Sequence, residues 1–84
     1  MPLSLLETTM HKQTLRYAVG RAIFCPSCTK VLDWKDAVLL DSPSRVFILC
    51  GADFDRMVQN MSSVEHAAFV ARVEITDGRE LSRA

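Results

Sequence analysis

In two short segments of the chain, two residues separate a cysteine from a second potential metal ligand. In RAIFCPSCTKV these residues are Cys25 and Cys28, and in VFILCGADFDR they are Cys50 and Asp53. Thiolates and carboxylates both bind Zn²⁺, which takes four ligands at the corners of a tetrahedron. Twenty-one residues separate the two pairs, close to the spacing of zinc sites built from two such turns. The pattern therefore predicts one zinc ion bound by these four residues.

The residues inside each pair suit a tight turn. Pro26 fixes its own φ angle, and Gly51 permits backbone angles that other residues resist. Each pair also follows an apolar segment. If those two segments pair as strands, the four ligands come together at one end of a sheet.

The fourth ligand has alternatives. Asp53 stands at the start of a helical pattern, where an Asp often serves only as an N-cap. His66 would replace it if the helix folded back over the cysteines, and His11 precedes the first expected strand. The cysteines themselves have two alternatives to metal binding, a redox or free-thiol role and burial without any ligand.

Residues 24–54 resemble the zinc-ribbon family of rubredoxin-like knuckles. The resemblance rests on CPSC at 25–28 and CGAD at 50–53. The family usually has Gly after each pair, where this chain has Thr29 and Phe54, and Cys as the fourth ligand. It implies a structural zinc ion, and nucleic-acid binding is common in the family. Short zinc-knuckle proteins also resemble accessory regulators encoded by bacteria and phages.

A second, weaker resemblance is to the start of a glutaredoxin. There a strand leads to CPxC at a helix N-terminus, and the helix lowers the pKa of the first thiol. The segment CPSCTKVLDWKDAVLL fits that start. The chain has no Gly-Gly turn, and its only later proline, Pro43, lies in a polar turn. This redox alternative also leaves the match between Cys50 and Asp53 unexplained.

The hydrophobic pattern predicts three strands. Alternating residues in TLRYAV, residues 14–19, indicate a half-buried strand that continues to the first cysteine pair. The apolar run RVFILC, residues 45–50, indicates a strand buried on both faces. Residues 30–41 between them fit a strand or a helix, and DSPS, residues 41–44, is a turn.

A helix is predicted from about Asp53 to Val73, because apolar residues recur there at helical spacing. We therefore expect an α+β fold, with a small three-stranded antiparallel zinc-ribbon-like sheet and a C-terminal α-helix. Residues 1–76 are expected to form a single domain and residues 77–84 a flexible tail. The apolar stripe of the helix comprises Met57, Met61, Val64, Ala68 and Ala71.

Composition narrows the class of protein. The chain has 84 residues, of which 49% are hydrophobic and 24% charged, as in a globular domain rather than a disordered chain. Its three cysteines, an odd number, argue against a secreted disulfide scaffold. No signal peptide and no apolar run of about 20 residues is present. We therefore expect a cytoplasmic protein with no membrane segment.

The expected function is binding rather than catalysis. The chain has no HExxH, no H-x-E paired with the cysteines and no Gly-rich phosphate loop. We expect no enzyme activity and no small-molecule substrate. A zinc-stabilised adaptor or regulator would act through a protein partner or self-association, using Phe69, Val70 and Val73 beside the stripe. These residues could instead pack against the N-terminal segment.

Nucleic-acid binding is the alternative function, with Tyr17 or Trp34 stacking on a base. The formal net charge is zero, and three thiolates with one Zn²⁺ would bring it to about −1, which favours a protein partner slightly. A thiol–disulfide redox protein is the second alternative. The basic candidates for nucleic-acid contact are Lys12, Arg16, Arg21, Lys30, Lys35 and Arg45.

Overall fold

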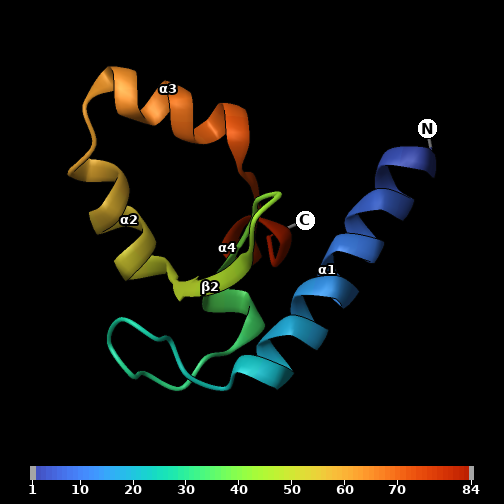
Figure 1. Cartoon of the computed structure of the whole chain (residues 1–84). Coiled ribbons are helices and arrows are strands. Elements are labelled where there is room, and N and C mark those ends of the chain that lie inside the picture. Colours follow the sequence, from blue (N-terminus) through green and yellow to red (C-terminus); the bar gives the residue numbers. More distant parts are fainter. Residues whose placement is uncertain (1, 84) are drawn as a thin grey trace.

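The computed structural model describes the backbone of residues 2–83 and the side chains of residues 11–83. Helices lie around a three-stranded antiparallel sheet (Figure 1), which confirms the predicted α+β class. In chain order the elements are α1 Pro2–Ala22, the 3₁₀ helix η1 Trp34–Asp36, β1 Ala37–Asp41, β2 Val46–Cys50, α2 Gly51–Gln59, α3 Ser63–Arg72, β3 Glu74–Asp77 and α4 Gly78–Leu81.

Strand β1 is the centre of the sheet, with β2 on one side and β3 on the other. Its first four residues are apolar and buried, as expected of a strand covered on both faces. It pairs with β2 from Ala37, opposite Cys50, to its last residue. The register with β3 places Val38 opposite Asp77. Cys50 and the end of β3 therefore lie at the same end of the sheet, on either side of the start of β1.

The predicted strand at residues 14–19 is wrong, because these residues lie in α1. Leu15 and Val19 are buried and lie four residues apart, one helical turn. Tyr17, which the alternating pattern placed on the same face, is exposed. The buried residues of the segment therefore follow helical spacing and not the alternation of a strand. No helix among residues 2–83 is long and apolar enough to cross a membrane.

The single helix predicted over residues 53–73 is two helices, α2 and α3. Residues 60–62 separate them. The Ser62 hydroxyl accepts from the N–H of Glu65 at 3.1 Å, and Glu65 Oε1 accepts from the N–H of Ser62 at 2.9 Å. This reciprocal capping box starts a new helix. The predicted apolar stripe is therefore interrupted.

Residues 77–84, predicted to be a flexible tail, contain the end of β3 and helix α4. Helix α4 contacts η1, α1 and β1. Its first residue, Gly78, is buried beneath Trp34. A Cβ at this position would collide with the carbonyl oxygen of Trp34 and lie 2.9 Å from Leu15 Cδ2. The chain therefore needs glycine at this close approach.

We expect Gly78→Ala to lower the free energy of unfolding by about 2 kcal/mol or more, because the added methyl group meets backbone. Gly20→Ala is the matched control. Nothing lies within 4 Å of a Cβ at Gly20, in α1, so this change should stabilise the protein by about 0.5–1 kcal/mol. Urea unfolding followed by circular dichroism measures both. Equal effects of the two substitutions would contradict the packing of α4.

Candidate metal centre

The first ligand pair lies in a hairpin between α1 and η1, and we call residues 25–30 the first knuckle. Phe24 forms an antiparallel bridge with Val31. Inside that bridge, the N–H of Cys25 donates to the carbonyl of Lys30 at 2.9 Å. The bridge and this bond close the hairpin that carries the two thiols. The predicted strand leading to this pair is thus reduced to the single bridge.

Thr29 completes the first knuckle in a left-handed backbone conformation, with φ of 60°. Its N–H donates to the carbonyl of Cys25 at 2.8 Å. This is the position at which zinc ribbons usually have glycine. Left-handed backbone costs a residue with a side chain about 1–2 kcal/mol. The knuckle therefore forms in spite of a residue that resists its geometry.

The second ligand pair lies where β2 passes directly into α2. Cys50 is the last residue of β2 and the N-cap of α2, which begins at Gly51. Asp53 lies in the first turn, three residues after Cys50, so the two share a side of the helix end. Asp53 is therefore not the N-cap. The second pair joins a strand to a helix rather than a strand to a strand.

The ligand atoms of the four residues all lie within 4.8 Å of one another. Cys28 Sγ is 3.6 Å from Cys50 Sγ, and Cys25 Sγ is 3.2 Å from Asp53 Oδ2. Bonds of about 2.3 Å at tetrahedral angles place two sulfur ligands about 3.8 Å apart. The cysteines are free, and only Cys28 of the four ligands is exposed. The cluster is therefore compatible with binding a metal ion.

Backbone N–H groups stabilise the buried thiol of Cys25. The N–H of Cys50 donates to Cys25 Sγ at 3.4 Å, and the backbone of Cys28 and Ser27 contributes further hydrogen bonds. Burial and the hydrogen bond that Cys25 donates to Asp53 raise the pKa of Cys25, but the backbone bonds outweigh both and hold the pKa below its ordinary value of 9.0. They favour the thiolate, the form that binds a metal.

Asp53 is the acidic centre of the cluster. Its hydrogen bond raises the pKa of Cys28 to about 12, and hydrogen bonds from Cys28, Cys25 and Cys50 hold the pKa of Asp53 below its usual range. Arg56 Nη1 donates to Asp53 Oδ1 at 3.0 Å, and Oδ2 accepts from Cys25. Without a cation, a proton therefore stays on Cys28. Metal binding would release it.

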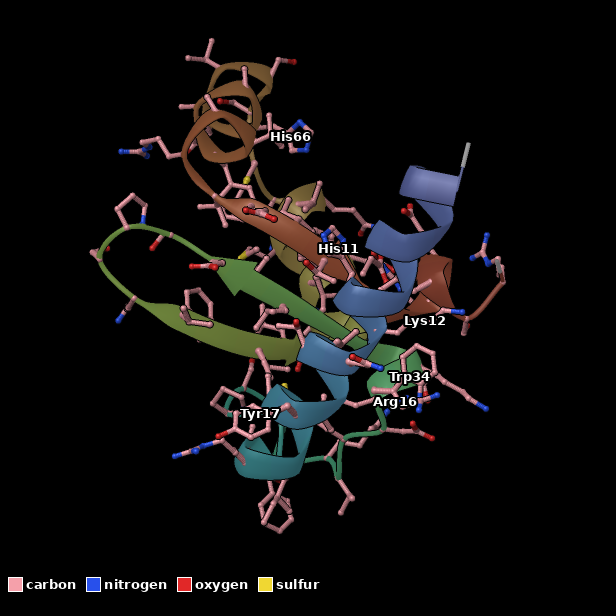
Figure 2. The ribbon with its side chains drawn as sticks, turned by 90° about the vertical axis from the view of Figure 1, so that its right-hand side faces the viewer. His11, Lys12, Arg16, Tyr17, Trp34 and His66 are labelled. Carbon is pink, nitrogen blue, oxygen red and sulfur yellow. The ribbon has the colours of Figure 1, made fainter. Side chains whose placement is uncertain are left out.

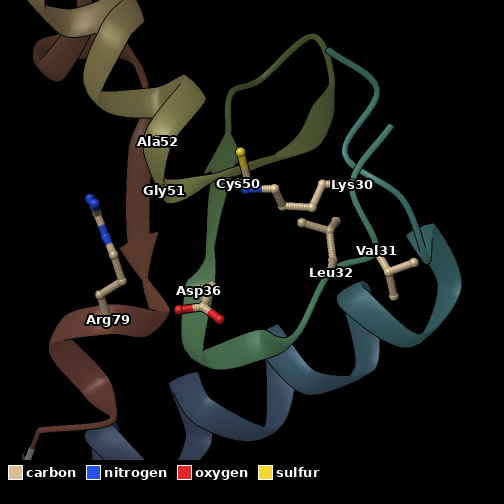
Figure 3. Close-up of a pocket in the computed structure, with 8 residues that line it drawn as sticks. All are labelled: Lys30, Val31, Leu32, Asp36, Cys50, Gly51, Ala52 and Arg79. Atoms are coloured by element: carbon tan, nitrogen blue, oxygen red, sulfur yellow. The ribbon is translucent and has the colours of Figure 1, made fainter. Parts of the chain in front are cut away.

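Arg79 of α4 supports the second ligand pair, and the sequence did not indicate this role. Its guanidinium donates to both oxygens of Asp55 at 2.8 and 3.0 Å and also binds Asp77. Its side chain lies beside Gly51 (Figure 3), where an added Cβ would lie 2.8 Å from Arg79 Cδ. Gly51 does not adopt a positive φ, so the predicted need for an unusual backbone angle is wrong, and its small size instead leaves room for the flexible Arg79 side chain.

A cavity of about 340 Å³ lies beside the cluster (Figure 3). Charged side chains reach this cavity from the first knuckle, η1 and α4: Lys30, Asp36 and Arg79. The cavity is lined by Lys30, Val31, Leu32, Asp36, Cys50, Gly51, Ala52 and Arg79.

Neither histidine belongs to the cluster. His66 lies exposed on α3 and His11 lies exposed on α1 (Figure 2). Over the part of the chain whose side chains are described, no other group of three or more metal-binding residues comes together. The predicted ligand Asp53 therefore occupies the fourth position, for which His66 was the alternative.

The apolar residues predicted for partner contact face mainly inward. Phe69 and Val73 are partly buried and pack against the hydrophobic core, while Val70 is exposed. The break between α2 and α3 turns this segment back toward the sheet, so two of the three residues are used internally. Phe69 and Val73 thus pack within the protein, while the N-terminal segment named in the packing alternative, residues 3–10, lies outside the residues whose side chains are described.

Three of the predicted basic residues stack on aromatic rings. The guanidinium of Arg16 lies 4.7 Å from the ring centroid of Trp34. Arg21 lies 5.5 Å from the Tyr17 ring, and Arg45 lies 5.2 Å from the Phe47 ring. Lys30 lines the cavity beside the cluster and Lys35 is exposed on η1. These three arginines therefore each contact an aromatic ring of the protein itself.

Comparison of the chain with models of protein families, with curated proteins and with solved structures gave no match. The resemblance to zinc ribbons therefore rests on the two ligand pairs alone. The function of the site has to be argued from its geometry.

We expect Thr29→Gly to raise the free energy of unfolding by about 0.5–1 kcal/mol, because glycine removes the strain of a positive φ but is more flexible when unfolded. Thr29→Ala is the matched control, since it keeps the strain and should not stabilise the protein. Urea unfolding in the presence and absence of zinc measures both variants. Stabilisation by alanine equal to that by glycine would contradict the strained knuckle.

The metal-free protein should lose stability as the pH rises from about 9 to about 12. In this range the unfolded thiol of Cys28 loses its proton before the folded one, whose pKa is about 12, so protons favour the folded state. Cys25, with its lowered pKa, does not change the free energy of unfolding with pH above its ordinary pKa of 9.0, because it is then ionised in both states. Urea midpoints measured across this range should fall, and Cys28→Ser should flatten the fall. If the urea midpoint of Cys28→Ser fell with pH as in the unchanged protein, the fall could not be due to the raised pKa of Cys28.

Proposed function

We propose that this chain is a small binding module stabilised by one zinc ion at Cys25, Cys28, Cys50 and Asp53. The convergence of these four ligand atoms within 4.8 Å, from two separate segments, carries the proposal. Tetrahedral sites rich in thiolates are typical of zinc or of iron–sulfur clusters. A single centre with one carboxylate among its ligands favours zinc.

The role of the ion would be structural. It would join the first knuckle to the junction of β2 and α2, whereas the protein alone attaches the knuckle by one isolated bridge and a few backbone hydrogen bonds. A chain of 84 residues has a small core to stabilise it. Zinc binding contributes on the order of 10 kcal/mol to folding in small zinc domains.

The geometry supports binding rather than catalysis or thiol exchange. Four protein ligands would fill a tetrahedral zinc ion and leave no position for a reacting water. A CPxC redox centre relies on an accessible thiol with a lowered pKa at the start of a helix. Here the first thiol, Cys25, has a lowered pKa but is fully buried, and no helix begins between Cys28 and η1 at Trp34. The redox alternative therefore lacks the accessible first thiol and the helix start on which it relies.

Mass spectrometry of protein purified without a His-tag should give about one zinc per chain. The three thiols should resist a thiol reagent until a chelator is added. Asp53→Ala should weaken zinc binding at least about tenfold, because it removes a ligand. The matched control, His66→Ala, should leave the affinity unchanged.

Two outcomes would overturn the proposal. One is a metal-free protein in which Cys25 and Cys28 cycle between dithiol and disulfide, which would support the redox alternative. The other is stoichiometric binding of iron with the optical absorption of an iron–sulfur cluster. Loss of zinc affinity in His66→Ala but not in Asp53→Ala would reassign the fourth ligand.

A further inference from the structure

A second hollow, which we call the α1–β2 groove, is lined by none of the four residues of the cluster. It has a volume of about 500 Å³ and lies between the last turns of α1, the start of the first knuckle and β2. Tyr17, Phe24 and Val46 remain 66%, 52% and 57% exposed. The residues that line it are Tyr17, Ala18, Arg21, Ala22, Phe24, Pro26, Val46, Phe47 and Ile48. Most of this lining is apolar.

Two arginines give the groove a positive charge. Arg21 Nη1 donates to the hydroxyl of Tyr17 at 2.7 Å, and its guanidinium also lies over the Tyr17 ring. Arg45 lies over Phe47, another lining residue. Stacking orders a guanidinium and leaves its N–H groups able to bind a carboxylate with two hydrogen bonds. Among the residues whose side chains the structure describes, no acidic residue lines the groove, so the described lining does not balance the charge of Arg21.

The third stacked arginine belongs elsewhere. Figure 2 shows Arg16 with Trp34 on one flank of α1 and Tyr17 on the other. Arg16 and Trp34 do not line the groove. The positive charge therefore comes from Arg21, which lines the groove, and from Arg45, which lies over the lining residue Phe47. An occupant has to complement both this charge and the apolar lining.

We propose that the α1–β2 groove binds an acidic segment of a partner protein, which inserts an apolar side chain and places carboxylates opposite Arg21 and Arg45. This inference rests on the proposed role of the chain as a binding module. The volume of the groove accommodates a few large side chains. Apolar anchors in such hollows supply most of the affinity of a protein contact. Charge complementarity then selects the partner and its orientation.

The groove fits the other classes of occupant less well. A second copy of the chain would bring its own Arg21 and Arg45 toward the first pair, which like charges oppose. Single-stranded nucleic acid would need free aromatic faces and a basic track for phosphates. The rings of Tyr17 and Phe47 each have an arginine over one face, and the chain has no net positive charge.

The test uses the zinc-loaded full chain and a synthetic array of octapeptides. Each peptide carries two central residues chosen from Leu, Ile, Phe, Trp and Ser, flanked by Asp and Glu, by Ser, or by Lys. We expect acidic peptides with apolar centres to bind at least about tenfold more tightly than their Lys-flanked or Ser-centred counterparts. Raising the salt concentration should weaken this binding.

Matched variants locate the contact. Arg21→Glu and Arg45→Glu should each reduce binding of the best acidic peptide at least about tenfold, whereas Arg72→Glu makes the same charge change on the exposed end of α3 and should have no effect. Val46→Ser should weaken binding, and Val64→Ser, at a residue 80% exposed on α3, should not. Circular dichroism and zinc content confirm that each variant is folded.

The remaining outcomes overturn the proposal. One such outcome is that acidic peptides with apolar centres bind no more tightly than the others. Another is that an oligothymidylate of about 12 nucleotides binds more tightly than the best acidic peptide. A mass that rises with protein concentration in light scattering, and falls in Val46→Ser, would make a second copy the occupant. Zinc content measured on the same sample separates the two proposals. A chain that binds zinc but no peptide would contradict the groove proposal and leave the zinc proposal standing.

Discussion

Four potential anions lie within 4.8 Å of one another where two distant segments of the chain meet. Like charges this close cannot all ionise unless a cation joins them. In the protein alone the conflict is relieved by N–H groups directed at Cys25, by Arg56 beside Asp53 and by a proton held on Cys28. A bound metal ion would replace that proton. The position of the first knuckle against the sheet depends on how this conflict is resolved.

The start of α2 is fixed from two directions. On one side, Cys50 and Asp53 belong to the ligand cluster. On the other, Arg79 lies beside Gly51 and joins Asp55 to Asp77. A partly buried arginine between two carboxylates contributes more than an exposed single pair, because its charges are shared within a network. The C-terminal residues are therefore part of the structure that positions the ligands.

The grouping of Cys25, Cys28, Cys50 and Asp53 could be predicted because each pair is local in sequence, and a two-residue spacing restricts how a pair can turn. The surrounding elements could not be predicted as well, because helical and alternating patterns overlap in short segments such as residues 14–19. The break before α3 could have been predicted, since Ser62 and Glu65 form a capping box at its standard spacing. The ion pair between Arg79 and Asp55 could not have been predicted, because 24 residues separate its partners.

The cluster and the α1–β2 groove share one hairpin. Cys25 is fully buried and its sulfur belongs to the cluster, while its neighbours Phe24 and Pro26 line the groove. Successive residues of extended chain point to opposite sides, so a hairpin that directs Cys25 inward also directs Phe24 outward. A metal ion that fixes Cys25 would therefore fix one wall of the groove. In such an arrangement a structural metal contributes to recognition without contacting the partner, because it sets the shape of the surface that does.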